Sequence, residues 1–253
     1  MNAYSALALV YDMVMDHVDY EGWADYILHI VELNAEVDDH AKTRILELGC
    51  GTGLFTVELL EQTSATIVAA DGSASMLEWA EKRLKEDKKR VSLAQFDFES
   101  GWDSQSGAEP FDIVLLLYDC INYIQTPEGL SALFAGVKAN MKPESVFVFD
   151  QSTPANSINN AAFFEDEGEQ DGISYSRKSS FDPGVRVHTT QFEIATPDGV
   201  FHENHVQKAW TREEIQGAIQ TAGLTVIKAY DGFSLDEAID ESERIHWVVK
   251  VAQ

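Results

Sequence analysis

The first half of the chain alternates short apolar runs with amphipathic segments, a pattern typical of parallel strands connected by helices. One amphipathic segment has Pro127 at its first helical position and apolar residues at helical spacing, and Pro143 is expected to stop it. The apolar runs predict five strands, at residues 44–48, 66–70, 91–96, 111–117 and 146–149. The pattern therefore predicts an α/β fold with a doubly wound, mostly parallel sheet.

The chain changes character near residue 151. Polar and apolar residues roughly alternate from Gly172 to Lys208, with turn signals at 182–184 and 197–199, which predicts an antiparallel meander. This meander would be an insertion after the fifth strand.

The sequence after the meander predicts a return to the first sheet. Thr211 and Glu214 have the spacing of a capping box, and Gly223 is suitably placed to end the helix that they begin. Strands over 224–230 and 244–251 would bring the sheet to seven strands. We therefore expect one domain made of residues 1–150 and 209–253, with residues 151–208 as an inserted lobe.

The first 40 residues are expected to form two helices that precede the sheet. Trp23, Ile27, Ile30 and Val31 give an apolar stripe at helical spacing.

The first predicted strand runs into a glycine-rich turn and then a helix. Glycine at positions 49, 51 and 53 allows a tight turn and a close approach of the backbone to a ligand. Leu54 stands where a dinucleotide fingerprint requires a small residue. The order that begins at Glu47, E-x-G-x-G-x-G, resembles instead the S-adenosylmethionine loop of class I methyltransferases. A turn that serves only packing is the alternative.

Asp71 follows the second strand, where α/β nucleotide binders place an acid that accepts hydrogen bonds from ribose hydroxyls. Alternatively, it interacts with the macrodipole of the next helix, although Ser73 can cap that helix and free Asp71. The segment resembles the family's D-x-S-x-x-M-L. Gly72 replaces a bulkier residue found in many relatives, so Met76 is expected to supply more of the apolar contact with adenine.

The resemblance implies further cofactor contacts at the ends of the third and fourth strands. In the family, an acid at the position of Asp97 accepts from the adenine amino group, and the next backbone N–H, here that of Phe98, meets a ring nitrogen. Asp97 could equally form a turn. After the fourth strand, Tyr118 is expected beside the cofactor, and Asp119 and Asn122 beside the substrate.

Several further segments resemble a bacterial subgroup related to amino-sugar N,N-dimethyltransferases. This resemblance implies a small-molecule acceptor, with nitrogen as the first candidate for the methylated atom and oxygen as the second, and it adds Tyr11 to the substrate residues. The segments are Tyr11-Asp12, Asp19-Tyr20 through Trp23 and Tyr26, residues 117–123, residues 203–208 and residues 242–246.

His205 is the candidate general base. A methyl sulfonium is already an activated electrophile, so a base is needed only when the nucleophile arrives protonated. In a strand, His205 shares a face with Glu203 and Gln207, and the carboxylate could orient the imidazole. A structural histidine bonded within the meander is the alternative, and His188 and His202 have less support.

The position of the meander predicts that it roofs the cofactor cleft together with the N-terminal helices, residues 1–40, and selects the acceptor. The meander could equally be a dimerisation sheet in a homodimer, because an exposed strand edge invites pairing.

Charge and composition narrow the partners. The 43 acidic and 18 basic residues give a formal net charge of −25, which opposes binding to nucleic acid. The acidity would also suit a salty habitat. No apolar run reaches the roughly 18 residues of a membrane span, and no signal peptide is apparent, so we expect a cytoplasmic protein. Cys50 and Cys120 lack the companion spacing of a zinc site, and no metal is expected.

Together these features predict an S-adenosylmethionine-dependent methyltransferase that acts on a small molecule. Two other functions stay open: a non-catalytic module that binds the cofactor, and a nicotinamide-dependent oxidoreductase on a similar fold, against which Leu54 argues.

Overall fold

A computed structural model describes residues 4, 6–35, 43–96, 109–161 and 165–252. Seven strands form one sheet in the order β10-β11-β5-β4-β1-β2-β3. All of them run parallel except β11, which is antiparallel to both of its neighbours. The strands are β1 (Arg44–Leu48), β2 (Thr66–Asp71), β3 (Val91–Gln95), β4 (Phe111–Leu116), β5 (Met141–Ser152), β10 (Leu224–Asp231) and β11 (Arg244–Val251). The predicted doubly wound, seven-stranded fold is confirmed.

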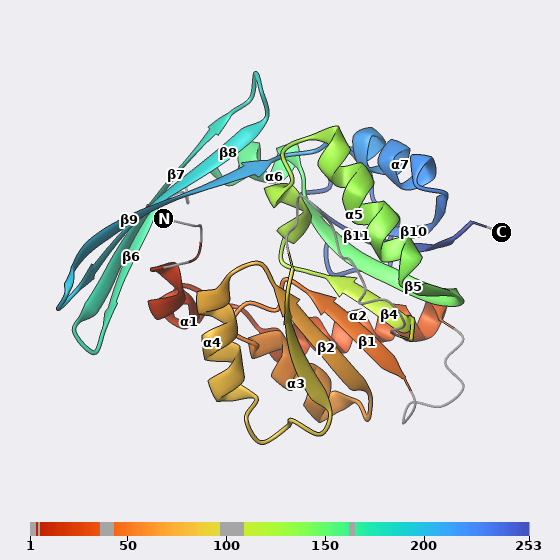
Figure 1. The fold of residues 1–253 in the computed structure, drawn as a ribbon. Helices are drawn as coiled ribbons and strands as arrows, with labels where there is room; N and C mark the ends of the chain where they lie inside the picture. Colours follow the sequence, from red (N-terminus) through yellow and green to blue (C-terminus); the bar gives the residue numbers. More distant parts are fainter. Residues whose placement is uncertain (1–3, 5, 36–42, 97–108, 162–164, 253) are drawn as a thin grey trace.

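Helices cover both faces of this sheet (Figure 1). One face packs against α2 (Tyr20–Asn34), α3 (Leu54–Gln62) and α4 (Ala74–Arg83). The other face packs against α5 (Pro127–Ala139) and α7 (Arg212–Thr221). Since both faces are buried, the central strands are apolar at every position or nearly so, which is why they were recognisable in the sequence.

The ends of α5 and α7 carry the capping residues that the local sequence predicts. Thr126 accepts a hydrogen bond from the Gly129 N–H at 3.1 Å, and Pro127 takes the first position of α5. Thr211 and Glu214 form the predicted capping box at the start of α7, and Gly223, with φ of 72°, follows its last residues.

One predicted boundary is wrong. Helix α5 ends at Ala139, and β5 begins at Met141, so Pro143 lies inside the strand and does not stop the helix. The pairing of β4 with β5 shifts register near Pro143, and Ser145 Oγ bonds to the Phe111 carbonyl there. This irregularity accommodates a residue without an N–H. At the N-terminus, the two predicted helices are present as the short α1 (Tyr11–Val14), which η1 (Leu7–Leu9) precedes, and the longer α2.

A second, antiparallel sheet of four strands lies between β5 and α7. It consists of β6 (Glu165–Gln170), β7 (Ile173–Asp182), β8 (Val187–Thr196) and β9 (Gly199–Lys208), in that order. The predicted meander over Gly172 to Lys208 is confirmed as its last three strands. Strand β6 and the short α6 (Pro154–Asn159) were not predicted.

The N-terminal segment, which here means Tyr4 and residues 6–14, packs against the inner face of the meander. Ala6, Leu7, Val10 and Val14 share a small apolar core with meander side chains such as Ile194. In Figure 1, α1 lies between the meander and the carboxyl ends of β1 and β2. Among the described residues, no helix combines the length and the apolar character that a membrane span requires.

Candidate active site

The glycine turn after β1 has a backbone that other residues rarely adopt. Gly49, Gly51 and Gly53 have φ of 77°, 56° and 84°. A Cβ added at Gly53 would lie 3.2 Å from Leu84 Cδ1, and one at Gly51 would lie 3.6 Å from the ring of Tyr11. The turn is therefore held closely between α4 and the N-terminal segment.

Asp71 connects this turn to the end of β2. Its carboxylate accepts from the Gly51 N–H at 2.9 Å and from the Ser73 N–H at 2.8 Å. Burial raises the pKa of Asp71, and these backbone donors oppose the rise. Ser73 caps α4 by accepting from the Met76 N–H at 3.3 Å, as predicted.

A small cavity of about 20 Å³ lies against the turn. Glu47 lines it, accepts from Thr56 Oγ1 at 2.7 Å, and has a pKa that burial raises to about 7. Tyr11 and Tyr118 line the same cavity, and the buried Tyr118 hydroxyl finds no hydrogen-bond partner among the described residues. An unsatisfied buried hydroxyl beside a carboxylate favours a polar ligand at this place.

The chain turns sharply at the end of β4. Tyr118 and Asp119 have φ of 60° and 48°, values that are uncommon for residues other than glycine and cost of order 1 kcal/mol each. The Asp119 N–H donates to the Asp150 carboxylate at 3.0 Å, and the Tyr118 ring stacks on Trp23 with centroids 4.2 Å apart. Strain of this kind often accompanies functional sites.

A partly buried charge cluster supports this turn. Arg244 pairs with Asp119 at 3.0 Å and with the fully buried Asp150. Burial raises the pKa of Asp150 to about 6, although Arg244 opposes this. Gln207 Nε2 donates to Asp119 at 2.8 Å. Arg244 and Asp150 were not among the predicted site residues. The available signals were that Asp150 is an acid directly after an apolar run and that Arg244 is a basic residue at the start of the last strand.

A cleft of about 510 Å³, here called the acceptor cleft, opens between the N-terminal segment, the meander and the carboxyl ends of the strands. Its aromatic lining includes Tyr4, Tyr11, Trp23, Tyr118, Tyr123 and Phe192. An adjoining polar cavity of about 230 Å³ shares Asp119, Arg177, Thr190, Gln207 and Arg244 with it. Tyr11 and Tyr118 line both the acceptor cleft and the small cavity at the glycine turn.

His205 lies on the wall of the acceptor cleft and is 3% exposed. Its Nε2 is 3.3 Å from Glu203 Oε2, so the predicted shared face is confirmed, and its Nδ1 is 3.2 Å from the Tyr123 hydroxyl. The Tyr123 hydroxyl in turn bonds to that of Tyr4. Tyr4 and Tyr123 were not among the predicted site residues.

Glu203 is held as a carboxylate by several donors. Burial alone would raise its pKa, but hydrogen bonds from His205 and from the backbone N–H groups of Ala6 and Leu7 bring it below the ordinary value. The Tyr4 N–H donates at 2.8 Å to Oε2, the oxygen that His205 also contacts. Glu203 thereby connects the meander to the N-terminal segment.

The opposite end of the N-terminal segment is tied to the glycine turn. Asp12 accepts from Thr52 Oγ1 at 2.7 Å and pairs with Arg83. The segment therefore bridges the turn, α4 and the meander.

The other predicted site residues have different surroundings. Asn122 lines the polar cavity, while its amide bonds to the backbone of Ser152 and Lys208. Met76 is buried in α4, and the Gly72 carbonyl accepts from Gln95 Nε2 at 3.1 Å. Asp97 and Phe98 lie outside the described residues.

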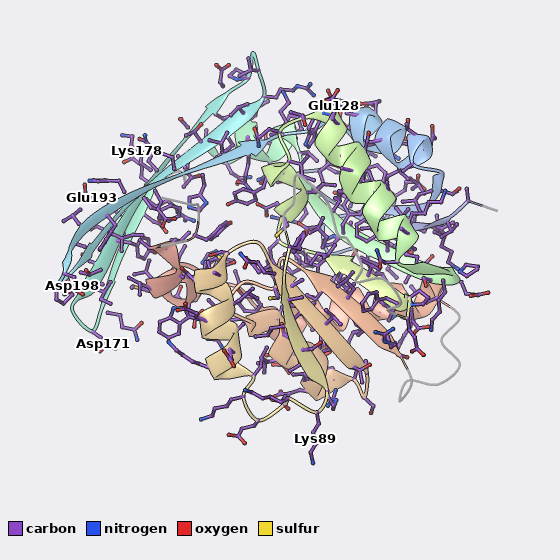
Figure 2. All side chains as sticks on the ribbon, viewed as in Figure 1. Lys89, Glu128, Asp171, Lys178, Glu193 and Asp198 are labelled. Carbon is purple, nitrogen blue, oxygen red and sulfur yellow. The ribbon has the colours of Figure 1, made fainter. Side chains whose placement is uncertain are left out.

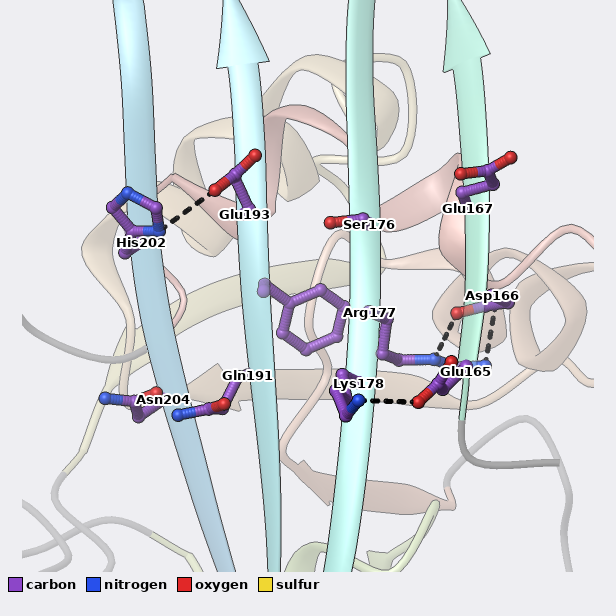
Figure 3. A pocket seen from close by; sticks show the side chains of 11 residues that line it. Glu165, Asp166, Glu167, Ser176, Arg177, Lys178, Gln191, Glu193, His202 and Asn204 are labelled. Atoms are coloured by element: carbon purple, nitrogen blue, oxygen red, sulfur yellow. Dashed lines mark hydrogen bonds and ion pairs between the residues drawn. The ribbon is translucent and has the colours of Figure 1, made fainter. Parts of the chain in front are cut away.

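His188 and His202 lie on different sides of the meander. His188 lines the polar cavity near Ser157, and burial lowers its pKa. His202 is exposed beside Glu193, in a hollow of about 780 Å³ on the face turned away from the acceptor cleft (Figure 3). Polar and charged side chains dominate this hollow, including the pair of Lys178 with Glu165, as on a solvated surface. Within the described ranges, no cluster of three or more potential ligands is placed to hold a metal ion.

Comparisons with known proteins agree with this geometry. A model of the methyltransferase domain family matches residues 45–144. The chain is 27% identical over 247 residues to the provisionally named methyltransferase YqeM of Bacillus subtilis (strain 168), covering 96% of this chain and 94% of that protein. It is 26% identical over 190 residues to dTDP-3-amino-3,4,6-trideoxy-alpha-D-glucopyranose N,N-dimethyltransferase of Streptomyces venezuelae, covering 72% and 75%.

A solved structure extends the likeness to the whole fold. An S-adenosylmethionine-dependent methyltransferase from Clostridium acetobutylicum ATCC 824 superposes with a TM-score of 0.79 at 25% identity, and 100% of both chains is covered. The family model thus matches residues 45–144 as a methyltransferase domain, and over its whole length the chain is similar to S-adenosylmethionine-dependent methyltransferases.

Proposed function

We propose that this protein transfers a methyl group from S-adenosylmethionine to a nitrogen atom of a small molecule bound in the acceptor cleft. The observation that carries the proposal is that Tyr11 and Tyr118 line both the cavity at the glycine turn and the acceptor cleft. A cofactor at the turn and an acceptor in the cleft would share this wall, as in-line transfer requires.

The residues at the glycine turn fit the cofactor. The backbone of Gly49 and Gly51 can approach a ligand closely, and the unsatisfied Tyr118 hydroxyl and the Glu47 carboxyl can bond to its amino-acid end. We assign Asp71 to the ribose, and Gly53, Gly72, Met76, Asp97 and Phe98 remain predicted contacts. When bound, S-adenosylmethionine supplies a methyl group on a sulfonium that needs no further activation.

Nitrogen is the favoured acceptor atom, and oxygen is the second candidate. Aromatic walls attract an ammonium, and a chain of net charge −25 attracts cations in general. Among the relatives, the Streptomyces venezuelae enzyme is an N,N-dimethyltransferase of an amino sugar, and a structural neighbour from Streptoalloteichus is a sugar N-methyltransferase.

The chain's own residues would exclude water from the cleft and accept a proton from the bound amine. The N-terminal segment and the meander cover the cleft, in keeping with a division into residues 1–150 and 209–253, with 151–208 as a cap. An amine that arrives as an ammonium must lose a proton before it can attack, and His205 is the proposed acceptor of that proton. Tyr11, Asp119 and Asn122 remain the predicted substrate contacts.

Two measurements test the proposal. In calorimetry, S-adenosylhomocysteine should bind and NADH should not, and Asp71→Ala should weaken binding by about 1–3 kcal/mol because charge-assisted hydrogen bonds are lost. Asp198→Ala, in the exposed turn between β8 and β9, is the matched control. Unchanged affinity in Asp71→Ala would remove this residue from the site.

The second measurement follows labelled methyl groups from the cofactor into a panel of amines and hydroxyl compounds. Label in an amine supports the proposal, and label in a hydroxyl compound alone would move the acceptor atom to oxygen. Cofactor binding without transfer to any member of the panel or to a metabolite extract would favour the non-catalytic module instead.

A further inference from the structure

We propose that Tyr4, Tyr123 and His205 form a proton relay with a fixed direction, in which the Tyr4 hydroxyl oxygen takes the proton from the methyl acceptor. This inference rests on the proposed function and deepens it, since it assigns the group that contacts the acceptor. The three side chains are joined by hydrogen bonds on the wall of the acceptor cleft.

The direction of the relay follows from Glu203. An ionised carboxylate only accepts hydrogen bonds, so His205 Nε2, 3.3 Å from Glu203, must carry a hydrogen. In the neutral imidazole, Nδ1 then has none and accepts from the Tyr123 hydroxyl at 3.2 Å. A hydroxyl has a single hydrogen, so Tyr123 cannot also donate to Tyr4, and the Tyr4 hydroxyl donates to Tyr123.

The oxygen of Tyr4 is thereby left with an acceptor site and no hydrogen to donate elsewhere. Tyr4 lines the acceptor cleft, so a molecule that hydrogen-bonds to this oxygen must present an N–H or O–H donor. A primary or secondary amine meets this requirement in both its neutral and its protonated forms. A carboxylate or phosphate oxygen does not.

Proton transfer along the relay is balanced. The N–H bond of an ammonium breaks and leaves its electron pair on nitrogen, while the proton moves to Tyr4. The Tyr4 hydrogen passes to Tyr123, and the Tyr123 hydrogen passes to His205 Nδ1. The resulting imidazolium is stabilised by the Glu203 carboxylate, and the freed lone pair of the amine can attack the methyl group.

His205 serves as the terminus of the relay and does not contact the acceptor directly. Both ring nitrogens already have partners within the protein, and the residue is 3% exposed. Burial raises the pKa values of Tyr4 and Tyr123, which keeps both phenols protonated, so that each can pass a proton on without resting as a phenolate. The groups that face His205 are Glu203 on its own strand, Tyr123 in η3 (Cys120–Tyr123), Tyr4 and the ring of Phe192 on β8.

The direction of the relay can be tested without cofactor or acceptor. Nitrogen-15 NMR of the histidine side chains distinguishes the two neutral tautomers, and a His205→Gln variant assigns the signal among the seven histidines. We expect hydrogen on Nε2 and none on Nδ1 in the neutral imidazole. Hydrogen on Nδ1 would reverse the relay, make Tyr4 a donor and overturn the inference, whatever the protein methylates.

Kinetics test the role of Tyr4 in transfer. Sarcosine, ethanolamine and 2-amino-2-deoxyglucose are the probe amines, and Tyr4→Phe should lower kcat about 100-fold at neutral pH with a smaller change in KM. The defect should shrink above the pKa of the amine, because the free base needs no proton acceptor. The control is Tyr230→Phe, which also removes a single hydroxyl; within the described part of the chain this hydroxyl accepts one hydrogen bond, from Asn34, and its loss should leave transfer unchanged.

Failure of the relay and failure of the proposed function give different results. If the wild type methylates a probe and Tyr4→Phe keeps its kcat and pH profile, the relay is wrong and the function stands. If no probe is methylated, the tautomer of His205 still decides the direction of the relay.

Discussion

Glu47 lines the cavity at the glycine turn, and its burial makes the stability of the folded protein depend on pH. Glu47 is 4% exposed, and among the described residues its carboxyl accepts one hydrogen bond, from Thr56. Burial raises the pKa of this carboxyl to about 7. The folded protein therefore favours the protonated form more than the unfolded chain does. The stabilisation from this preference is fully present below the ordinary pKa of 4.5 and is lost as the pH rises through 7.

Glu47→Gln should remove this pH dependence, because the amide stays neutral. Between pH 5 and pH 8, the free energy of unfolding of the wild type should fall relative to that of the variant, by up to about 3 kcal/mol. Urea unfolding at several pH values without cofactor measures the difference. Glu144→Gln, at an exposed position in β5, should run parallel to the wild type, and a parallel course for Glu47→Gln would contradict the prediction.

At the scale of an element, the turn from β1 into α3 depends on a backbone that only glycine adopts readily. Gly53 has φ of 84° and lies against Leu84 of the segment that follows α4. Gly217, in the interior of α7, has open space around the position of a Cβ. The two glycines therefore respond in opposite ways to the same substitution.

Gly53→Ala should destabilise the protein by about 1–2 kcal/mol, because a left-handed backbone strains an L-residue and the added Cβ crowds Leu84. Gly217→Ala should stabilise it by about 0.5–1 kcal/mol, because alanine is the better helix former. Midpoints of urea unfolding report both effects. A neutral Gly53→Ala would mean that the turn adapts, and the strain argument for this site would fail.

The sequence predicts elements best where local forces dominate. The apolar runs of β1, β2 and β4, the capping box of α7 and the cap at Ser73 were recognisable from a few neighbouring residues. Strand β6, Glu165–Gln170, has no apolar side chain, so no local pattern predicts it. It forms a strand because it pairs with β7. The acidic side chains of β6 also oppose edge-to-edge pairing of two copies of the chain at this strand. The predicted homodimer would therefore need another surface.

At the scale of the whole molecule, the dominant feature is a formal net charge of −25. Figure 2 shows Asp171 and Asp198 at tips of the meander and Glu193 projecting from its face. Among the described ion pairs, several acidic partners are largely exposed, such as Glu109 and Glu165. Exposed pairs of this kind contribute little, so repulsion among the excess carboxylates remains.

Added salt should therefore raise the melting temperature by a few degrees. The Debye length falls from about 10 Å at 0.1 M to 3 Å at 1 M ionic strength, so most of the gain should come at the lower concentrations. Thermal unfolding between 0.02 M and 1 M sodium chloride at pH 8 measures the curve. A flat curve, or a rise that begins only near 1 M, would show that charge repulsion does not limit stability.

The sequence by itself determined the sheet, the glycine turn and the acid at Asp71, because each depends on the periodicity, spacing or backbone freedom of nearby residues. It also put Glu203 and His205 on one face of a strand. Only the tertiary structure decided which groups meet them. Tyr4 and Glu203 are 199 positions apart, and Arg244 and Asp119 are 125 apart. Such contacts depend on the order of the strands and on how the N-terminal segment crosses their ends, and no local pattern contains that information.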